Sequence, residues 1–169
     1  MSEPTGTPAA GSAWSRTPWR RTSTRPVYDN QWISVREDIV ELPDGKTTLY
    51  GVVRSGERAG VLPFKDSETV ILVQQYRYVV GLHTWEMPTG GMHEDEVALE
   101  CAQRELAEET GYRAGRLTPL TTIHTSKSIL DETAHLFVAE ELVTATDARR
   151  DPTEFLEIRE FPFGEALRM

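Results

Sequence analysis

The segment 90–112 (GGMHEDEVALECAQRELAEETGY) constrains the fold more than any other part of the 169-residue chain. It contains a run rich in Ala, Leu, Glu, Gln and Arg without Gly or Pro, which predicts a helix over 96–110. Gly111 follows that run directly, and a glycine at this place is typical of a helix C-terminus. The rest of the chain must therefore supply a layer against which this helix packs.

The predicted helix has two faces of different chemistry. Its apolar stripe, which we expect to face the core, is formed by residues three and four apart: Leu99, Ala102 and Leu106. Three carboxylates, Glu105, Glu108 and Glu109, gather on an adjacent face in the last turn. Their mutual repulsion costs roughly a few tenths of a kcal/mol per pair, and the helix dipole disfavours them there. Arg104 can relieve part of this repulsion by pairing with Glu108.

Two interpretations of the acidic face follow from the residues alone. It is either a solvated surface or a carboxylate cluster that holds hard divalent cations such as Mg²⁺. The glycines ahead of the helix favour the cluster, because the Pro88-Thr89-Gly90-Gly91 backbone can approach a metal or a phosphate without side-chain hindrance.

The segments around the helix predict several strands. Extended stretches are expected, in order, at 33–40, 47–54, 60–64, 70–76, 133–139 and 156–161. Pro43-Asp44-Gly45 supplies a turn between the first two, residues 83–91 are expected to form a loop, and a short helix begins near Gly164. This order predicts an α+β fold with a mixed sheet.

Composition narrows the class of protein. The chain has 18 basic and 27 acidic residues, a net charge of −9, which argues against binding a nucleic-acid backbone. No apolar run approaches the ~18 residues of a membrane helix. The single cysteine, Cys101, excludes an internal disulfide and a cysteine-based zinc site, and it favours a cytoplasmic location.

The N-terminal residues differ from the rest. Residues 1–27 are rich in Ser, Thr, Gly, Pro and Arg, with little to bury, so we expect a disordered tail followed by one domain over 28–169. The Arg-rich, acid-poor composition is also that of an organellar transit peptide, but three prolines interrupt any amphipathic helix.

The residues of segment 90–112 resemble a known motif. The spacing of Gly90, Glu96, Arg104-Glu105-Leu106, Glu108-Glu109 and Gly111-Tyr112 is that of the Nudix box of the Nudix hydrolases, which more often have an aliphatic residue at the place of Tyr112. Residues 70–77 (VILVQQYR) and 85–91 (WEMPTGG) are similar to the ADP-ribose and nucleotide-sugar pyrophosphatase branch. The resemblance covers 28–167 and implies the Nudix fold: an α/β/α sandwich with a mixed sheet, plus an N-terminal antiparallel strand pair.

This resemblance implies an enzyme. We expect a Mg²⁺-dependent pyrophosphohydrolase, with Mn²⁺ as a substitute, that cleaves a nucleoside diphosphate sugar to a nucleoside monophosphate and a sugar phosphate. Ser128 stands where enzymes specific for ADP-ribose usually have a proline, so another diphosphate sugar remains an alternative. A non-catalytic Nudix domain that senses a nucleotide metabolite is the competing class. The branch also suggests a homodimer in which the strands of 28–54 cross between subunits.

The same resemblance assigns roles to residues. The expected metal ligands are Glu105, Glu108, Glu109 and the carbonyl of Thr89. The expected catalytic residues are Glu108, Arg104 and Glu154, the last as general base with Asp151 and Glu132 as rivals. The expected substrate-binding residues are Arg54, Arg77, Glu86, Gly90, Gly91, Tyr28, Trp32 and Glu132. Each of these side chains also has a structural interpretation. The two arginines can form surface ion pairs, the two aromatic residues can pack against the fold, and Glu86 can fix the loop through a contact with Arg104.

Overall fold

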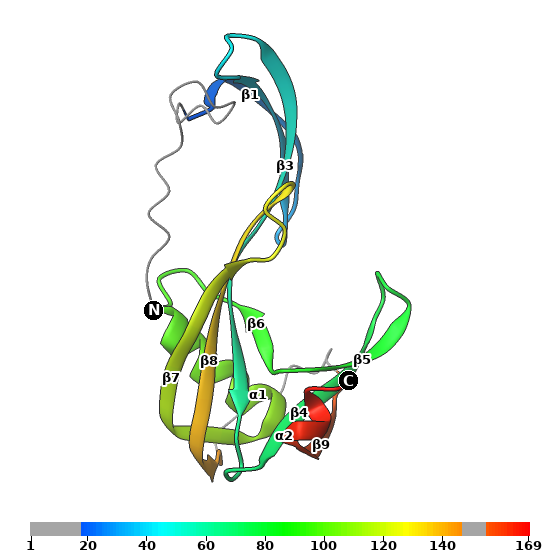
Figure 1. The fold of residues 1–169 in the computed structure, drawn as a ribbon, viewed down its shortest axis with the longest axis vertical. Helices are drawn as coiled ribbons and strands as arrows, with labels where there is room; N and C mark the ends of the chain where they lie inside the picture. Colours follow the sequence, from blue (N-terminus) through cyan, green and yellow to red (C-terminus); the bar gives the residue numbers. More distant parts are fainter. Residues whose placement is uncertain (1–17, 147–154) are drawn as a thin grey trace, which may run out of the picture. The chain divides into compact units, whose positions relative to one another are not determined.

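The structure, a computed structural model, describes residues 18–146 and 155–169 (Figure 1). The chain divides into an N-terminal unit that ends at Arg54 and a C-terminal unit that begins at Ser55. Its strands are β1 Arg20–Asp29, β2 Ser34–Glu41, β3 Thr47–Pro63, β4 Thr69–Arg77, β5 Leu82–Glu86, β6 Thr89–Gly91, β7 Tyr112–His124, β8 Leu130–Thr144 and β9 Glu157–Pro162. Its helices are α1 Ala98–Thr110 and α2 Phe163–Ala166. No helix in the described ranges is long and apolar enough to cross a membrane.

The N-terminal unit is a three-stranded antiparallel sheet of β1, β2 and the first part of β3. The turn between β2 and β3 contains Gly45, whose φ of 81° is easily adopted by glycine. The expected strand pair is therefore present, with β1 as a third strand beside it.

The expected disordered tail over 1–27 is wrong for residues 20–27, which belong to β1; residues 1–17 lie outside the described residues. The basic side chains that suggested a tail are paired across the sheet, because Arg20 lies 2.6 Å from Glu41 and Arg25 lies 2.5 Å from Glu37. Strand β1 is exposed along its whole length and is held by backbone pairing with β2 and by these ion pairs. Because it has no apolar alternation, the sequence pattern did not predict it.

The C-terminal unit contains two sheets. In the first, β8 lies between the second part of β3 and β7, and β6 pairs with β3; in the second, β4 lies between β5 and β9. The expected loop over 83–91 is wrong, since β5 and β6 occupy most of it. Strand β7 was not expected, because Gly115 and Pro119 are strand breakers in sequence. As the edge strand of its sheet, β7 can accommodate a proline.

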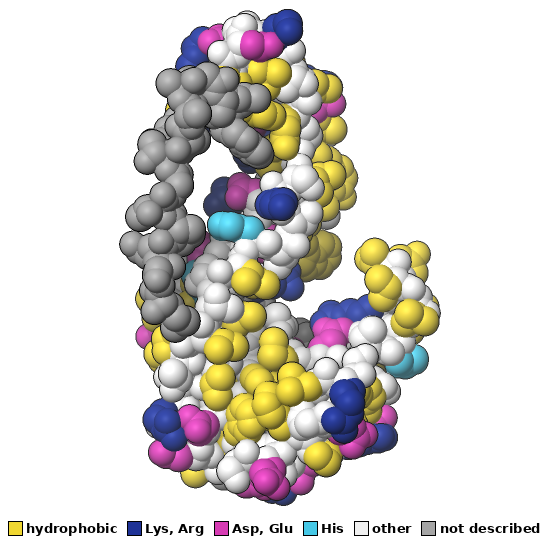
Figure 2. Space-filling view, viewed as in Figure 1, with side chains coloured by type: hydrophobic (Ala, Val, Ile, Leu, Met, Phe, Trp, Pro, Cys, Tyr) yellow, Lys and Arg dark blue, Asp and Glu magenta, His cyan; other side chains and the backbone are white. Residues whose placement is uncertain are grey.

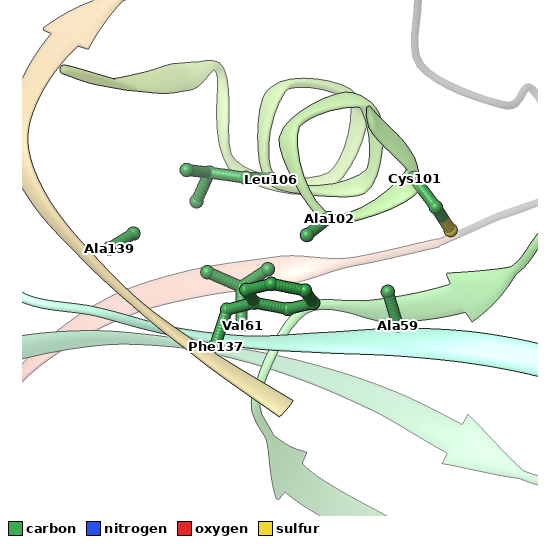
Figure 3. Packing of buried hydrophobic residues seen from close by; sticks show 7 residues of the cluster. All are labelled: Ala59, Val61, Cys101, Ala102, Leu106, Phe137 and Ala139. Atoms are coloured by element: carbon green, nitrogen blue, oxygen red, sulfur yellow. The ribbon is translucent and has the colours of Figure 1, made fainter. Parts of the chain in front are cut away.

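Helix α1 packs on the first sheet of the C-terminal unit. Figure 3 shows its buried side chains pointing at those of β3 and β8, and together they form the cluster Ala59, Val61, Cys101, Ala102, Leu106, Phe137 and Ala139. The helix ends at Gly111 as expected, with a φ of 77° and its N–H bonded to the carbonyl of Ala107 at 2.9 Å. Leu99, expected in the core, is about half exposed, whereas Cys101 is fully buried.

A second small core supports the other sheet of this unit. Val70, Leu72 and Phe161 are buried in it, and Phe163 and Ala166 of α2 pack against them. The short helix expected near Gly164 is thus present, and the helical layer on this side consists of α2 alone among the described residues. Figure 2 shows apolar side chains at the tip of the β4–β5 hairpin, where Tyr78 and Val79 are the most exposed.

Candidate active site

Arg104, in the middle of α1, is the centre of the acidic cluster. Its Nε and Nη2 donate hydrogen bonds to the two carboxylate oxygens of Glu96, each at 2.8 Å. Its Nη1 lies 2.6 Å from Oε1 of Glu105 and 3.0 Å from Oε2 of Glu108. Nη2 also donates to the backbone carbonyl of Gly91, at 2.9 Å. One guanidinium therefore joins the turn before the helix, two carboxylates of the helix and strand β6.

The turn before the helix presents Glu96 to this guanidinium. We expected the helix to begin at Glu96, but α1 begins two residues later, and Glu96 closes a turn in which its carboxylate accepts the backbone N–H of His93 at 2.9 Å. The hydrogen bond from Arg104 lowers the pKa of Glu96 to about 2, and the same contact raises the pKa of Arg104. Both groups stay charged at neutral pH, and the carboxylates around Arg104 outnumber it.

Two of the helix carboxylates are buried rather than solvated. Glu105 is 7% exposed and Glu109 is 2% exposed, on the face of α1 that also carries Ala102 and Leu106. Glu105 lies against the backbone of Gly90, where an added Cβ would overlap the carboxylate group. Burial of carboxylates at this density is costly unless cations compensate it, so a solvated acidic surface does not describe this face.

The donor set fits a divalent metal ion. Glu105, Glu108 and Glu109 offer hard oxygen ligands within about one helical turn, as Mg²⁺ or Mn²⁺ prefers. Within the described ranges, no three His, Cys, Asp or Glu side chains already converge on one metal position. The Nη1 atom of Arg104 contacts both Glu105 and Glu108. Arg104 therefore holds these two carboxylates side by side, while Glu96 binds the other edge of its guanidinium.

The glycine-rich segment ahead of the helix forms strand β6, and its residues Thr89, Gly90 and Gly91 pair with β3. The hydroxyl of Thr89 donates to the carbonyl of Met87 at 2.8 Å. The thiol of Cys101 lies 3.7 Å and 3.6 Å from the carbonyl oxygens of the two glycines. Burial raises the pKa of Cys101 to about 12, so this group stays a neutral thiol and does not act as a thiolate ligand.

Arg77 and Glu86, both expected to bind substrate, contact each other. The Nε of Arg77 lies 2.8 Å from Oε1 and 3.1 Å from Oε2 of Glu86, and Nη2 also donates to Oε2. The hydroxyl of Thr84 donates to Oε1 of the same carboxylate. The structural interpretation of Glu86 expected a contact with Arg104. Among the described residues, Glu86 instead accepts hydrogen bonds from Arg77 and Thr84, both on the β4–β5 hairpin.

Glu132, at the start of β8, is held by two hydroxyl donors and one ion pair. The hydroxyls of Ser55 and Thr125 donate to its carboxylate at 2.6 Å and 2.7 Å, and Nε of Arg58 lies 2.9 Å away. Burial favours the neutral form of Glu132, but the hydrogen bonds from Ser55 and Thr125 outweigh it and lower the pKa of this carboxyl. Glu132 therefore anchors the β7–β8 turn to β3, and it is a poor proton acceptor at neutral pH.

The remaining expected residues belong to the N-terminal unit or lie outside the described residues. Tyr28, Trp32 and Arg54 belong to the N-terminal unit, where the two aromatic side chains are 54% and 72% exposed. Glu154 and Asp151 lie outside the described residues.

Sequence reasoning missed four residues that support the site: Ser55, Arg58, Thr84 and Thr125. Ser55, Arg58 and Thr125 contact Glu132 from another strand or turn, and Thr84 contacts Glu86 from the same strand. Arg58, for example, stands opposite Gly91 in the β3–β6 register, which only the strand pairing reveals.

Comparison with known proteins agrees with this arrangement of helix, glycine-rich strand and carboxylates. Residues 54–169 match the model of the NUDIX domain, and residues 19–53 match that of the nucleoside diphosphate sugar hydrolase N-terminal domain. The chain therefore belongs to the Nudix hydrolases. The expected mixed-sheet α+β Nudix fold is confirmed, and members of this family generally use divalent metal ions.

Among relatives, an ADP-ribose pyrophosphatase of Bacillus subtilis is 35% identical over 85% of this chain and 78% of its own length. A methanol dehydrogenase activator of Bacillus methanolicus is 32% identical over 86% of this chain and 79% of its own. A GDP-mannose pyrophosphatase of Klebsiella pneumoniae is 30% identical over 85% of this chain and 78% of its own length. The crystal structure of an ADP compounds hydrolase superposes with a TM-score of 0.80 at 21% identity, covering 92% of this chain and 84% of that one, which shows the shared fold.

Proposed function

We propose that this chain is a Mg²⁺-dependent pyrophosphohydrolase that cleaves a nucleoside diphosphate sugar into a nucleoside monophosphate and a sugar phosphate. The observation that carries the proposal is the pair of buried carboxylates on α1, Glu105 and Glu109, beside a guanidinium that already bridges Glu105 to Glu108. The names of the relatives, which include ADP-ribose and GDP-mannose pyrophosphatases, support a diphosphate-sugar substrate.

The proposed metal ligands are Glu105, Glu108, Glu109 and the carbonyl of Thr89. A bound divalent ion would neutralise the diphosphate and lower the pKa of the attacking water. The protein's part is to fix these ligands: Arg104 and Gly90 hold Glu105 in place, and Glu96 holds Arg104.

The reaction is hydrolysis of a phosphorus anhydride. The oxygen of a water attacks one phosphorus, the bond from that phosphorus to the bridging oxygen breaks, and the bridging oxygen leaves with the electron pair on the other phosphate. The water's proton goes to a general base, for which Glu154 is our first choice, since Glu132 is engaged by two hydroxyls and by an ion pair with Arg58. Arg77 is proposed to bind the diphosphate.

A substrate panel tests this function. ADP-ribose, ADP-glucose, GDP-mannose and ATP would be incubated with the chain and Mg²⁺, and the products followed by phosphorus NMR. We expect hydrolysis of the diphosphate sugars, with ADP-ribose preferred by a modest margin because Ser128 does not fix φ as a proline would. Turnover of ATP a hundredfold faster than every diphosphate sugar would contradict the substrate class. Binding of ADP-ribose without products would favour the alternative, a sensor domain.

We also propose a homodimer in which strands of the N-terminal unit cross to the second subunit. Among the described residues of that unit only Asp38 is buried, while Trp32 and Leu49 are largely exposed, so its sheet lacks an apolar core. The first 54 residues carry seven basic and six acidic side chains, and the others carry 11 and 21, which favours association between copies. Sedimentation equilibrium should give twice the chain mass, and a monomer at micromolar concentration would contradict this proposal.

A further inference from the structure

Arg77 stands at an unfavourable place for a residue that must hold a fixed direction. It is the last residue of β4 and pairs with Leu82, the first residue of β5. Between them lies the hairpin tip, where Tyr78 and Val79 are 88% and 94% exposed. A long side chain at the base of an exposed turn loses rotamer entropy when it is immobilised. Some neighbouring group must therefore fix its orientation.

Glu86 provides that fixation from the far end of β5. In the register of the hairpin, Glu86 stands opposite Val73, four residues before Arg77. Contact between Arg77 and Glu86 therefore requires the arginine side chain to reach back along the hairpin, away from the tip. Nε and Nη2 both donate to the carboxylate, which gives the two-point contact in which a planar guanidinium has one orientation.

Thr84 fixes the carboxylate in turn. Its hydroxyl donates to the same oxygen, Oε1, that accepts from Nε of Arg77. The hydrogen bond from Arg77 lowers the pKa of Glu86 and the one from Thr84 adds to the effect, so the carboxylate stays ionised at neutral pH. The side chain of Arg77 nevertheless keeps 43% of its surface exposed, against 27% for Glu86. The guanidinium is thus oriented and accessible at once.

The chain itself bounds the distance from this pair to the acidic cluster. Glu86 ends β5, and Gly90, against which Glu105 packs, is four residues further on. Four residues span at most about 14 Å between Cα atoms. The guanidinium of Arg77, bonded to Glu86, therefore lies at the end of the hairpin from which the chain runs on to the cluster.

We propose that Glu86, supported by Thr84, is a positioning residue that directs Arg77 at the substrate's diphosphate. This inference rests on the proposed function. It replaces two other roles for Glu86, direct contact with the substrate and contact with Arg104. Both oxygens of its carboxylate accept hydrogen bonds on the hairpin, and a planar guanidinium can bind a carboxylate with one edge and a phosphate with another.

A double-mutant cycle tests the proposal. Wild type, Glu86→Gln, Arg77→Ala and the double variant would be assayed with ADP-ribose and Mg²⁺, and ADP-ribose binding would be measured by calorimetry without divalent metal. We expect Glu86→Gln to raise KM and Kd about three- to tenfold, with kcat within about twofold, and to have no further effect when Arg77 is already alanine. Thr84→Val should act in the same direction more weakly, and Thr84→Ser should restore the wild-type value.

Glu160→Gln is the matched control, because it removes another carboxylate that pairs with a cation, Lys65 at 2.5 Å, on a different strand. It should leave KM and Kd unchanged. Equal losses from Glu86→Gln in both backgrounds, or a fall in kcat with weaker metal binding, would overturn the proposal in favour of a metal ligand. A lower melting temperature with unchanged KM and Kd would overturn it in favour of a structural ion pair. If wild type binds ADP-ribose without hydrolysing it, the proposed function fails, and the cycle is decided on Kd alone.

Discussion

The carboxylate of Glu105 rests on the α-carbon of Gly90, so closely that a methyl group there would occupy the same space. Gly90 lies in β6, which pairs with β3, and Glu105 lies on α1, which packs over β3. The strand cannot withdraw without breaking this pairing. The absence of a side chain at Gly90 therefore sets where Glu105 can point.

Replacing Gly90 with alanine should displace Glu105 while sparing the fold. The carboxylate is the end of a flexible side chain and can move, so we expect the melting temperature to fall by only a few degrees. Loss of one correctly placed ligand should lower kcat by about 100-fold or more. Steady-state kinetics and thermal unfolding of the same preparation measure both effects.

Two further glycine variants separate overlap from backbone effects. Gly51→Ala, on β3 of the N-terminal unit, meets no atom within 4 Å and should behave as wild type. Gly91→Ala also meets none, and it tests whether any side chain in β6 is harmful. Equal losses for the alanines at Gly90 and Gly91 would contradict a specific role for the overlap with Glu105.

Removal of the divalent metal should abolish hydrolysis, and loss of the Glu109 carboxylate should lower the activity that the metal supports. Glu109 is 2% exposed, and Glu109→Gln removes a proposed ligand with little change of volume. We expect kcat to fall by about 100-fold or more, with weaker Mg²⁺ binding in calorimetry. Glu100→Gln, at an exposed acidic position in the first turn of α1, is the control and should retain activity. Full activity of Glu109→Gln in EDTA would remove the metal assignment.

Local patterns predicted the main helix well. Its C-terminus at Gly111 follows from one glycine, and the crowding of Glu105, Glu108 and Glu109 is visible at helical spacing. Burial was less predictable: Leu99 lies at helical spacing from Ala102 and Leu106, yet it is half exposed while those two are buried against β3 and β8.

Contacts that depend on strand pairing could not be predicted. Glu86 and Arg77 are nine residues apart, and a contact between them requires the hairpin register. The three partners of Glu132 come from β3 and from the turn before β8, which sequence spacing does not bring together. Strand β1 was not predicted, because its side chains form ion pairs and do not alternate between apolar and polar residues.

Stability should depend on pH through Glu96. Its pKa is lowered from 4.5 to about 2 in the folded chain, so its contact with Arg104 contributes stability above the unfolded value. That contribution is lost as pH falls from about 5 toward 2. The difference in unfolding free energy between wild type and Glu96→Gln should be on the order of 1–2 kcal/mol at pH 7 and vanish near pH 2. Urea unfolding in EDTA across this range measures it; a constant difference would contradict the role of the charge.

The last prediction concerns the proton acceptor, for which Glu154 and Glu132 remain to be compared. Glu132 is held by Ser55 and Thr125 with a lowered pKa, so Glu132→Gln should loosen the β7–β8 turn and leave the acid limb of the pH profile in place. Glu154→Gln should lower kcat by about 10²- to 10⁴-fold, flatten the acid limb and spare substrate binding, because a positioned general base acts only on the reacting water. A loss below about threefold for Glu154→Gln, beside a large loss for Asp151→Asn or Glu132→Gln, would transfer the role to that residue.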